Sequence, residues 1–180
     1  FTRLNGGPMD YTPGIFVMDM ASITDGRNKN HVLATIANQL ALYITLYSPL
    51  QMAADFPEHY ERFMDAFQFI KDVDLDWIQS KYLLAEPGEY VVIARQGKKN
   101  GQWFCGGVTD GQKRTLEVPM SFLEAGKTYE ATIYADAEDA DYINNPQAYT
   151  IRKQHVTSED SLSMTMARGG GFAVSFIEIQ

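Results

Sequence analysis

The chain has 180 residues, of which 45% are hydrophobic and 21% are charged, a balance typical of a globular protein that can bury a core. Its formal net charge of −8 and its pI near 4.8 argue against a nucleic acid as partner, because a phosphate-binding surface needs a basic face. Cys105 is the only cysteine, so an intrachain disulfide is excluded.

The first sixteen residues, FTRLNGGPMDYTPGIF, combine prolines and glycines without any repeat period. Pro8 and Pro13 fix the backbone while the glycines relax it, so this segment is expected to form a stiff, shaped loop. A structural turn is the favoured interpretation. The alternative places Asp10 and Tyr11 on the rim of a pocket, facing a substrate, with Arg3 as a partner for a carboxylate.

Two helices are predicted next. The stretch from Val32 to Tyr47 carries no charged residue, and Asn30 is the expected N-cap. Its apolar positions run nearly all round the helix, so most of its sides must be covered. It falls short of the roughly 20 apolar residues that a membrane span needs. A second helix is expected from Pro57 to about Lys71, with one aromatic face and one charged face.

Beyond Asp74 the apolar residues alternate, as in strands, and Pro, Gly and Asp mark tight turns. This pattern predicts about eight short strands in an antiparallel β-sandwich, so the fold class is mainly β with two leading α-helices. The domain boundary is placed between residues 1–73 and 74–180. Tyr129 and Tyr134 are expected on opposite faces of their strand. The residues expected to be buried are Ile133, Leu162, Met164, Phe172 and Val174.

The sequence offers few residues for metal or nucleophilic chemistry. His31, His59 and His155 stand too far apart for the spacing of a zinc site. The acidic run of residues 136–141 lacks the glycine-centred spacing of a calcium loop, so a solvated loop is preferred. Cys105 lies in an apolar strand and is expected to be a small buried hydrophobe. No metal ligand is therefore assigned in this chain.

Several stretches resemble glycoside hydrolase family 97, whose members are bacterial α-glucosidases and α-galactosidases. They are FTR with GPMDYTPG, SPLQMAAD (residues 48–55), FQFIKDVDLDW (67–77), and the pair YVVIAR and WFCGGVTD (90–95 and 103–110). Each stretch alone is weak evidence, but their order and spacing make the resemblance specific. It implies that residues 1–73 are the end of a catalytic (β/α)8 barrel and that a C-terminal sandwich follows.

The resemblance also implies a function for the parent protein. It would be a calcium-dependent α-glycosidase acting on α-linked glucosides or oligosaccharides, with a retaining α-galactosidase of the same family as the alternative. Its catalytic carboxylates and calcium ligands would lie before Phe1, so this chain would hold no catalytic residue and would be inactive alone. The chain opens without Met, which favours a longer natural protein, located in the periplasm or at the outer membrane of a Gram-negative bacterium.

The role of the sandwich is left between two classes. In the first, it is a structural or oligomerisation domain beside the barrel. In the second, the chain is a free-standing, non-catalytic binding module. The uncharged helix favours the first class, because a barrel or a second copy could cover it. We expect this contact to involve Val32, Leu33, Ile36, Leu40, Leu42 and Ile44.

Overall fold

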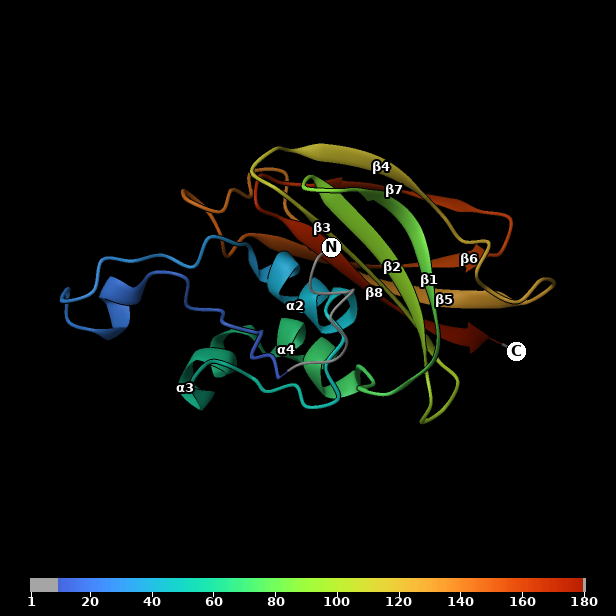
Figure 1. Cartoon of the computed structure of the whole chain (residues 1–180), viewed down its shortest axis with the longest axis horizontal. Helices are drawn as coiled ribbons and strands as arrows, with labels where there is room; N and C mark the ends of the chain where they lie inside the picture. Colours follow the sequence, from blue (N-terminus) through green and yellow to red (C-terminus); the bar gives the residue numbers. More distant parts are fainter. Residues whose placement is uncertain (1–9, 180) are drawn as a thin grey trace.

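A computed structural model describes residues 10–179 of the chain. Helices come first and eight strands follow, which confirms the predicted fold class. Figure 1 shows the helices gathered on one side of the strands. The helical part comprises a short 3-10 helix η1 (Met20–Ile23), α2 (Ile36–Thr45), α3 (Pro57–Tyr60), a 3-10 turn η2 (Glu61–Phe63) and α4 (Met64–Asp72).

The strands form one large and one small sheet. The large sheet has six strands in the order β1-β2-β3-β8-β5-β6, and the small sheet pairs β4 with β7. All neighbouring strands are antiparallel, as predicted. The strand bounds are β1 (Trp77–Glu86), β2 (Tyr90–Gly97), β3 (Trp103–Thr109), β4 (Arg114–Pro119), β5 (Thr128–Asp136), β6 (Tyr149–Thr157), β7 (Ser161–Met166) and β8 (Gly171–Ile179).

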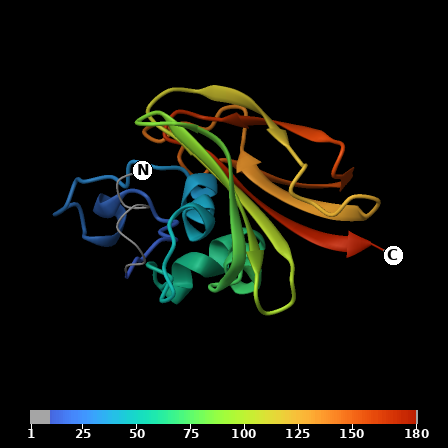
Figure 2. The same cartoon turned by 45° about the vertical axis from the view of Figure 1, so that its right-hand side comes forward.

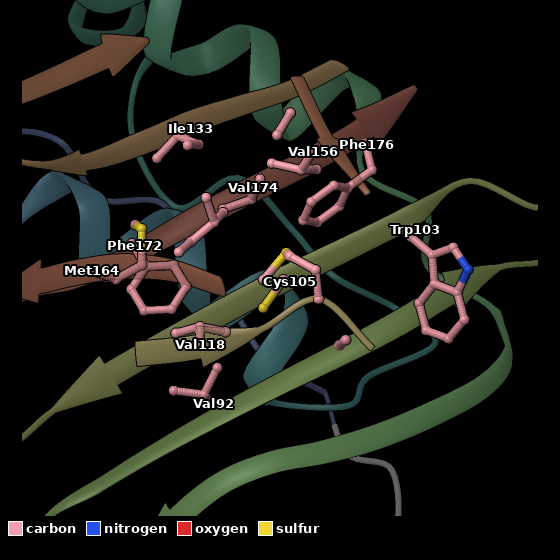
Figure 3. Packing of buried hydrophobic residues seen from close by; sticks show 14 of the residues in the cluster. Val92, Trp103, Cys105, Val118, Ile133, Val156, Met164, Phe172, Val174 and Phe176 are labelled. Atoms are coloured by element: carbon pink, nitrogen blue, oxygen red, sulfur yellow. The ribbon is translucent and has the colours of Figure 1, made fainter. Parts of the chain in front are cut away.

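The space between the two sheets holds the first hydrophobic core, which we call the sandwich core. Figure 3 shows Val118 and Met164 of the β4–β7 pair among residues of the large sheet such as Val92 and Phe172. All five residues that were predicted to be buried lie in this core, with exposures of 0–4%. Alternation along β5, β7 and β8 places them there, since every second side chain of a strand points to the same face.

The opposite face of the large sheet carries a second core, the helix-side core, beneath α2 and α4. Figure 2 shows the two layers, with the helices on one face of the sheet and β4 and β7 on the other. The alternation seen in the sequence implies one apolar face per strand, but β3 and most of β2 and β8 are buried on both faces. Tyr129 and Tyr134 do lie on opposite faces, and both are buried, one in each core.

The Gly-Gly pair of β3 explains how both faces can be packed so closely. A Cβ on Gly106 would lie 3.0 Å from the carbonyl oxygen of Ala41, so the absence of a side chain lets α2 rest on the strand. A Cβ on Gly107 would lie 2.3 Å from the ring of Phe172 in the sandwich core. Each glycine therefore makes room on one face of the same strand.

The contact predicted for the uncharged helix is corrected by the structure. Ile36, Leu40 and Ile44 have no exposed surface, because β3 and β8 of the same chain pack against α2. They are therefore not available to a second copy. Val32 and Leu42 are half-buried, and only Leu33 of the predicted set is well exposed, at 69%.

The helix boundaries also differ from the predictions. α2 begins four residues later than expected, and its N-cap is Thr35, whose side chain accepts the N–H of Asn38, rather than Asn30. The second predicted helix begins at Pro57 as expected, but it is divided into α3, η2 and α4, with a non-helical backbone at Phe63. None of the helices between residues 10 and 179 is long and apolar enough to cross a membrane.

Candidate functional site

The predicted site residues Asp10 and Tyr11 lie on the loop of residues 10–17, which is bridged to the loop of residues 48–56, and we call these two loops the junction loops. Arg3 lies outside the described residues. Asp10 is exposed and Tyr11 is half-buried. Tyr11 forms a parallel bridge with Gln51, and the N–H of Ala54 donates to the carbonyl oxygen of Pro13 at 3.0 Å. α2 lies between the two bridged residues in the sequence, so the two loops run side by side in the same direction.

Three side chains from the helices hold the turn at Pro13 and Gly14. The Oε1 atom of Gln39 accepts the N–H groups of Gly14 and Ile15, at 2.9 and 3.2 Å. The hydroxyl of Tyr43 lies within hydrogen-bond distance of two carbonyl oxygens, that of Pro13 at 3.2 Å and that of Met52 at 3.0 Å, and its single proton is shared between them. The hydroxyl of Tyr60 donates to the carbonyl oxygen of Gly14 at 2.6 Å. This network assigns a structural role to the turn.

Gly14 fits this network only because it has no side chain. Its φ of +91° lies in the left-handed region, which other residues rarely adopt. A Cβ at this position would also lie 2.6 Å from the hydroxyl oxygen of Tyr43. The nearby tyrosines remain protonated donors, because burial raises the pKa of both Tyr43 and Tyr60.

Asp55 anchors the second junction loop to the first. Its Oδ2 atom accepts the N–H groups of Phe16 and Val17, each at 2.8 Å, and its Oδ1 atom contacts the Nδ1 atom of His59. Burial acts to raise the pKa of Asp55, but hydrogen bonds from Val17, His59, Phe16 and Phe56 outweigh it and hold the pKa below its usual value. The charged carboxylate is thus fully engaged by the fold.

The chemistry of the junction loops is that of a scaffold. Hydrolysis of a glycosidic bond uses two carboxyl groups placed across the bond. Asp55 has a side chain that is only 5% exposed and directs its oxygens to backbone N–H groups and His59. Asp10 is exposed, and among residues 10–179 no hydrogen bond or ion pair to it is found. A substrate-facing role for Asp10 and Tyr11 stays a prediction.

Sequence reasoning missed Gln39 and Asp55. Gln39 was visible as an amide in an apolar helix, and a buried amide requires hydrogen-bond partners, which was a usable signal. Asp55 lies directly before the start of α3, but nothing in the sequence indicated that its partners would be Phe16 and Val17, 39 and 38 residues away. Such a pairing depends on the tertiary fold.

The acidic run begins at the end of β5 and continues into a loop, and the preferred solvated loop is wrong for Asp136, which is the last residue of that strand and is largely buried. Asp136 accepts the hydroxyl of Thr35 at 2.6 Å and the N–H groups of Ala167 and Gly171 at 2.8 and 2.9 Å. Burial raises the pKa of Asp136. Asp141 pairs with Arg168 at 3.0 Å. In the described part of the chain, no group of three or more His, Cys, Asp or Glu residues is arranged to hold a metal ion.

Cys105 is buried, as the sequence predicted, with 1% of its surface exposed. Burial raises the pKa of its thiol, so the reactive thiolate is disfavoured.

Comparisons with known proteins place this geometry in a family. The family model described as "Glycosyl-hydrolase 97 C-terminal, oligomerisation" matches residues 76–177, more than half of the chain. A retaining alpha-galactosidase of Bacteroides thetaiotaomicron is 34% identical over 179 residues, which cover 97% of this chain and 26% of that protein. A probable retaining alpha-galactosidase of Streptomyces bingchenggensis is 32% identical over 173 residues, covering 96% of this chain and 24% of that protein.

Among solved structures, a glycoside hydrolase family 97 enzyme from Pseudoalteromonas sp. strain K8, in complex with acarbose, superposes with a TM-score of 0.90 and 46% identity. The match covers 97% of this chain and 27% of that enzyme. The chain thus spans about a quarter of the length of the relatives that it matches. It belongs to glycoside hydrolase family 97, and residues 76–177 are the family's C-terminal oligomerisation domain.

Proposed function

We propose that this chain is the C-terminal part of an α-glycosidase that acts on α-linked glucosides, with the sandwich serving in assembly of the enzyme. The observation that carries the proposal is the 46% identity, over 97% of the chain, to family 97 structures in complex with acarbose and with panose. Panose is an oligosaccharide of α-linked glucose units. The retaining alpha-galactosidase of Bacteroides thetaiotaomicron is less similar, at 34% identity, and makes an α-galactosidase the second candidate.

The parallel pairing of the junction loops supports a barrel origin for residues 1–73. The parallel bridge between Tyr11 and Gln51, with α2 between them in the sequence, has the order of elements that repeats in a (β/α)8 barrel. A parallel bridge outside a larger sheet is unusual, because parallel strands normally belong to larger sheets with both faces covered. In the proposed parent protein, barrel strands would flank this bridge and would carry the catalytic carboxylates. Asp10, beside the bridge, is the residue of this chain that we place nearest the substrate.

Calcium enters the proposal only through the rest of the protein. Among residues 10–179 no group of three or more His, Cys, Asp or Glu residues is arranged to hold a metal ion, and Asp136 and Asp141 are engaged by hydrogen bonds and an ion pair. We therefore place the proposed calcium ligands in the catalytic barrel of the parent protein. A periplasmic or outer-membrane location of that protein is proposed from the family resemblance alone.

Hydrolysis of 4-nitrophenyl α-glucoside and 4-nitrophenyl α-galactoside by the full gene product tests the proposal. We expect the glucoside to be the better substrate, and residues 1–180 alone to release no nitrophenol above background, with or without calcium. Preference for the galactoside would favour the second candidate. Turnover by the purified 180-residue chain would contradict the placement of the reaction centre outside it.

A further inference from the structure

The helices cover only part of the helix-side face of the large sheet. β8 continues beyond them, as Figure 2 shows, and Ile177 and Ile179 on this end are 54% and 37% exposed. Leu75, in the segment between α4 and β1, is 36% exposed beside them. Leu75 and Ile177 line one groove of about 700 Å³ with Lys153 of β6. We call Leu75, Glu130, Lys153, Ile177 and Ile179 the open face.

At the end of β8, the apolar side chains lie on the open face, as they would on a face that is buried. Ala173 packs in the helix-side core, so Ile177 and Ile179 point to the same side by the two-residue period of a strand. Glu178 points to the other side, where it pairs with Lys127 at 3.1 Å in solvent. An antiparallel sheet usually places polar residues on a face that water covers. On β8 the order is reversed: charged Glu178 is on the sandwich side, and Ile177 and Ile179 are on the uncovered helix side.

Charges around the open face are balanced, unlike those of the whole chain. The chain has a formal net charge of −8, so two copies repel each other over most of their surface. Lys153 pairs with Glu130 at 2.7 Å within the open face. The groove walls also carry both signs of charge in equal number, with Lys71, Lys99 and Lys153 against Asp72, Asp74 and Asp76. This surface can therefore approach a second acidic copy without strong repulsion.

Pairing of sheet edges is a poor alternative. The register of β1 is irregular between Trp77 and Gln79 and between Tyr82 and Leu84, and such irregularities twist an edge strand away from a new partner. The other edge strand, β6, carries Arg152 and Lys153 side by side, and charged residues on an edge also discourage strand addition. Association through a face of the sheet is therefore preferred over association through its edges.

We propose that two copies of this chain associate through the open face. The proposal rests on the oligomerisation role described for the family domain at residues 76–177, and it names the surface. A second copy is the preferred occupant over the proposed barrel. The second junction loop, whose Leu50, Met52 and Phe56 are exposed, runs from α2 to α3, away from the C-terminal end of β8 (Figure 1). One molecule can thus bind both at once.

The substitution Ile177→Lys in the full gene product tests the surface. It places a cation in the centre of the open face, and we expect the dissociation constant for self-association to rise at least about tenfold in sedimentation velocity. The matched control is Ile78→Lys on β1, because Ile78 is also well exposed, at 57%, but lies at the sheet edge. The control should associate as the wild type does.

Equal weakening by both variants, no effect of Ile177→Lys, or a wild-type protein that is monomeric at all concentrations would overturn the proposal. Hydrolysis of 4-nitrophenyl α-glucoside should be unchanged in both variants, because Ile177 and Ile78 lie outside the junction loops. A wild-type protein that associates but does not hydrolyse the glucoside would count against the proposed function alone. Failure of the proposed function can therefore be told apart from failure of the proposed interface.

Thiol labelling gives a second, independent readout. Within residues 1–180 Cys105 is the only cysteine and is buried, so labelling of an introduced cysteine can be followed on its own peptide by mass spectrometry. We expect maleimide to label Ile177→Cys more slowly at concentrations where the protein associates, and Ile78→Cys at the same rate at all concentrations. Concentration-independent labelling of Ile177→Cys, in a protein that does associate, would place the interface elsewhere.

Discussion

The two faces of the large sheet are buried by different means. The sandwich core is formed by aliphatic, sulfur-containing and aromatic side chains of strands and of the turns between them. The helix-side core is rich in aromatic rings, and buried polar groups surround it, among them Asn38, Gln39 and Arg95. Arg95 of β2 donates to the carbonyl oxygen of Ile44, near the C-terminal end of α2, where a cation complements the helix dipole.

This difference shows that the two faces of one sheet can select their packing partners in two ways, by strand alternation alone or by alternation together with hydrogen bonds. Alternation alone fixes which side chains enter the sandwich core, because its partner is another sheet. The helix side depends in addition on hydrogen bonds that join α2 to β2 and to the loop before β8, such as the bond from Asn38 to the carbonyl oxygen of Gly170 at 3.0 Å. Substitutions on the two sides should therefore have different consequences.

The largest loss is expected on the helix side, from Phe69→Ala. Phe69 has no exposed surface, and its ring packs edge-on against Tyr134 and Phe104, with centroids 5.3 and 6.2 Å away. Removing it leaves a cavity between α4 and the sheet, at a cost of about 3 to 5 kcal/mol in the free energy of unfolding. Urea denaturation measures this. A change below 1 kcal/mol would mean that α4 contributes little to the fold.

Ile133→Ala makes the matching change in the sandwich core. Ile133 is fully buried among side chains of both sheets, so we expect a loss of about 2 to 5 kcal/mol through lost burial and a cavity. An unchanged urea midpoint would show that the sandwich core was placed on the wrong face of β5.

Asp55→Asn weakens the junction loops, which only the helix side has. It removes the charge from hydrogen bonds that are worth about 1.5 to 3 kcal/mol each when charged. Because the folded pKa of Asp55 lies below its unfolded value, its contribution is present above the unfolded pKa and is lost as the pH falls through the folded pKa. The stability difference from wild type should thus be largest near pH 7 and shrink in acid.

Asp136→Asn is a control for which the stability contribution of the carboxyl group should depend on pH in the opposite direction. Burial raises the pKa of Asp136, so its favourable contribution is present below the unfolded pKa and is lost as the pH rises through the folded pKa. Relative to wild type, this variant should therefore improve as the pH rises. Parallel pH profiles for the two variants would contradict the account of these carboxylates.

Gly14→Ala should give the smallest of these effects. A left-handed backbone costs a residue with a Cβ about 1 to 2 kcal/mol. At Gly14 the crowding by the Tyr43 hydroxyl, 2.6 Å from a Cβ, adds to this cost. Gly88→Ala is matched, because Gly88 has a φ of +88° but open space around it. Thermal unfolding should show a larger loss for Gly14→Ala, and equal losses would mean that Tyr43 moves aside freely.

The sequence predicts most of the sandwich, because strand alternation and turn residues are local signals. It predicts the helix side less well. The apolar face of α2 indicated that another surface covers it. The residues Ile36, Leu40 and Ile44 would be the same whether that surface is a barrel, a second copy or β3, so the sequence does not identify it. Only the small size of Gly106 hinted at a helix resting on that strand, and glycines in strands have other uses.

The candidate site shows the same limit. The Pro and Gly residues at 13 and 14 predict a stiff turn, and the structure has one, with Gly14 in the left-handed region. The partners of that turn, Gln39 and Tyr43, lie 25 and 30 residues away, and no local pattern selects them. The placement of Asp10 beside the parallel bridge of Tyr11 and Gln51 depends on tertiary pairing as well.

Because the same large sheet forms one wall of both cores, we expect the described chain to unfold as a single cooperative unit. The chain has two tryptophans, with Trp103 in the sandwich core and Trp77 in the helix-side core. The variants Trp77→Phe and Trp103→Phe each leave one reporter, so urea unfolding can be followed by fluorescence and by far-UV circular dichroism in each. We predict that the two signals coincide in both variants. A fluorescence transition of Trp77 that precedes the circular dichroism transition would show that the helical part unfolds on its own, and would contradict this expectation.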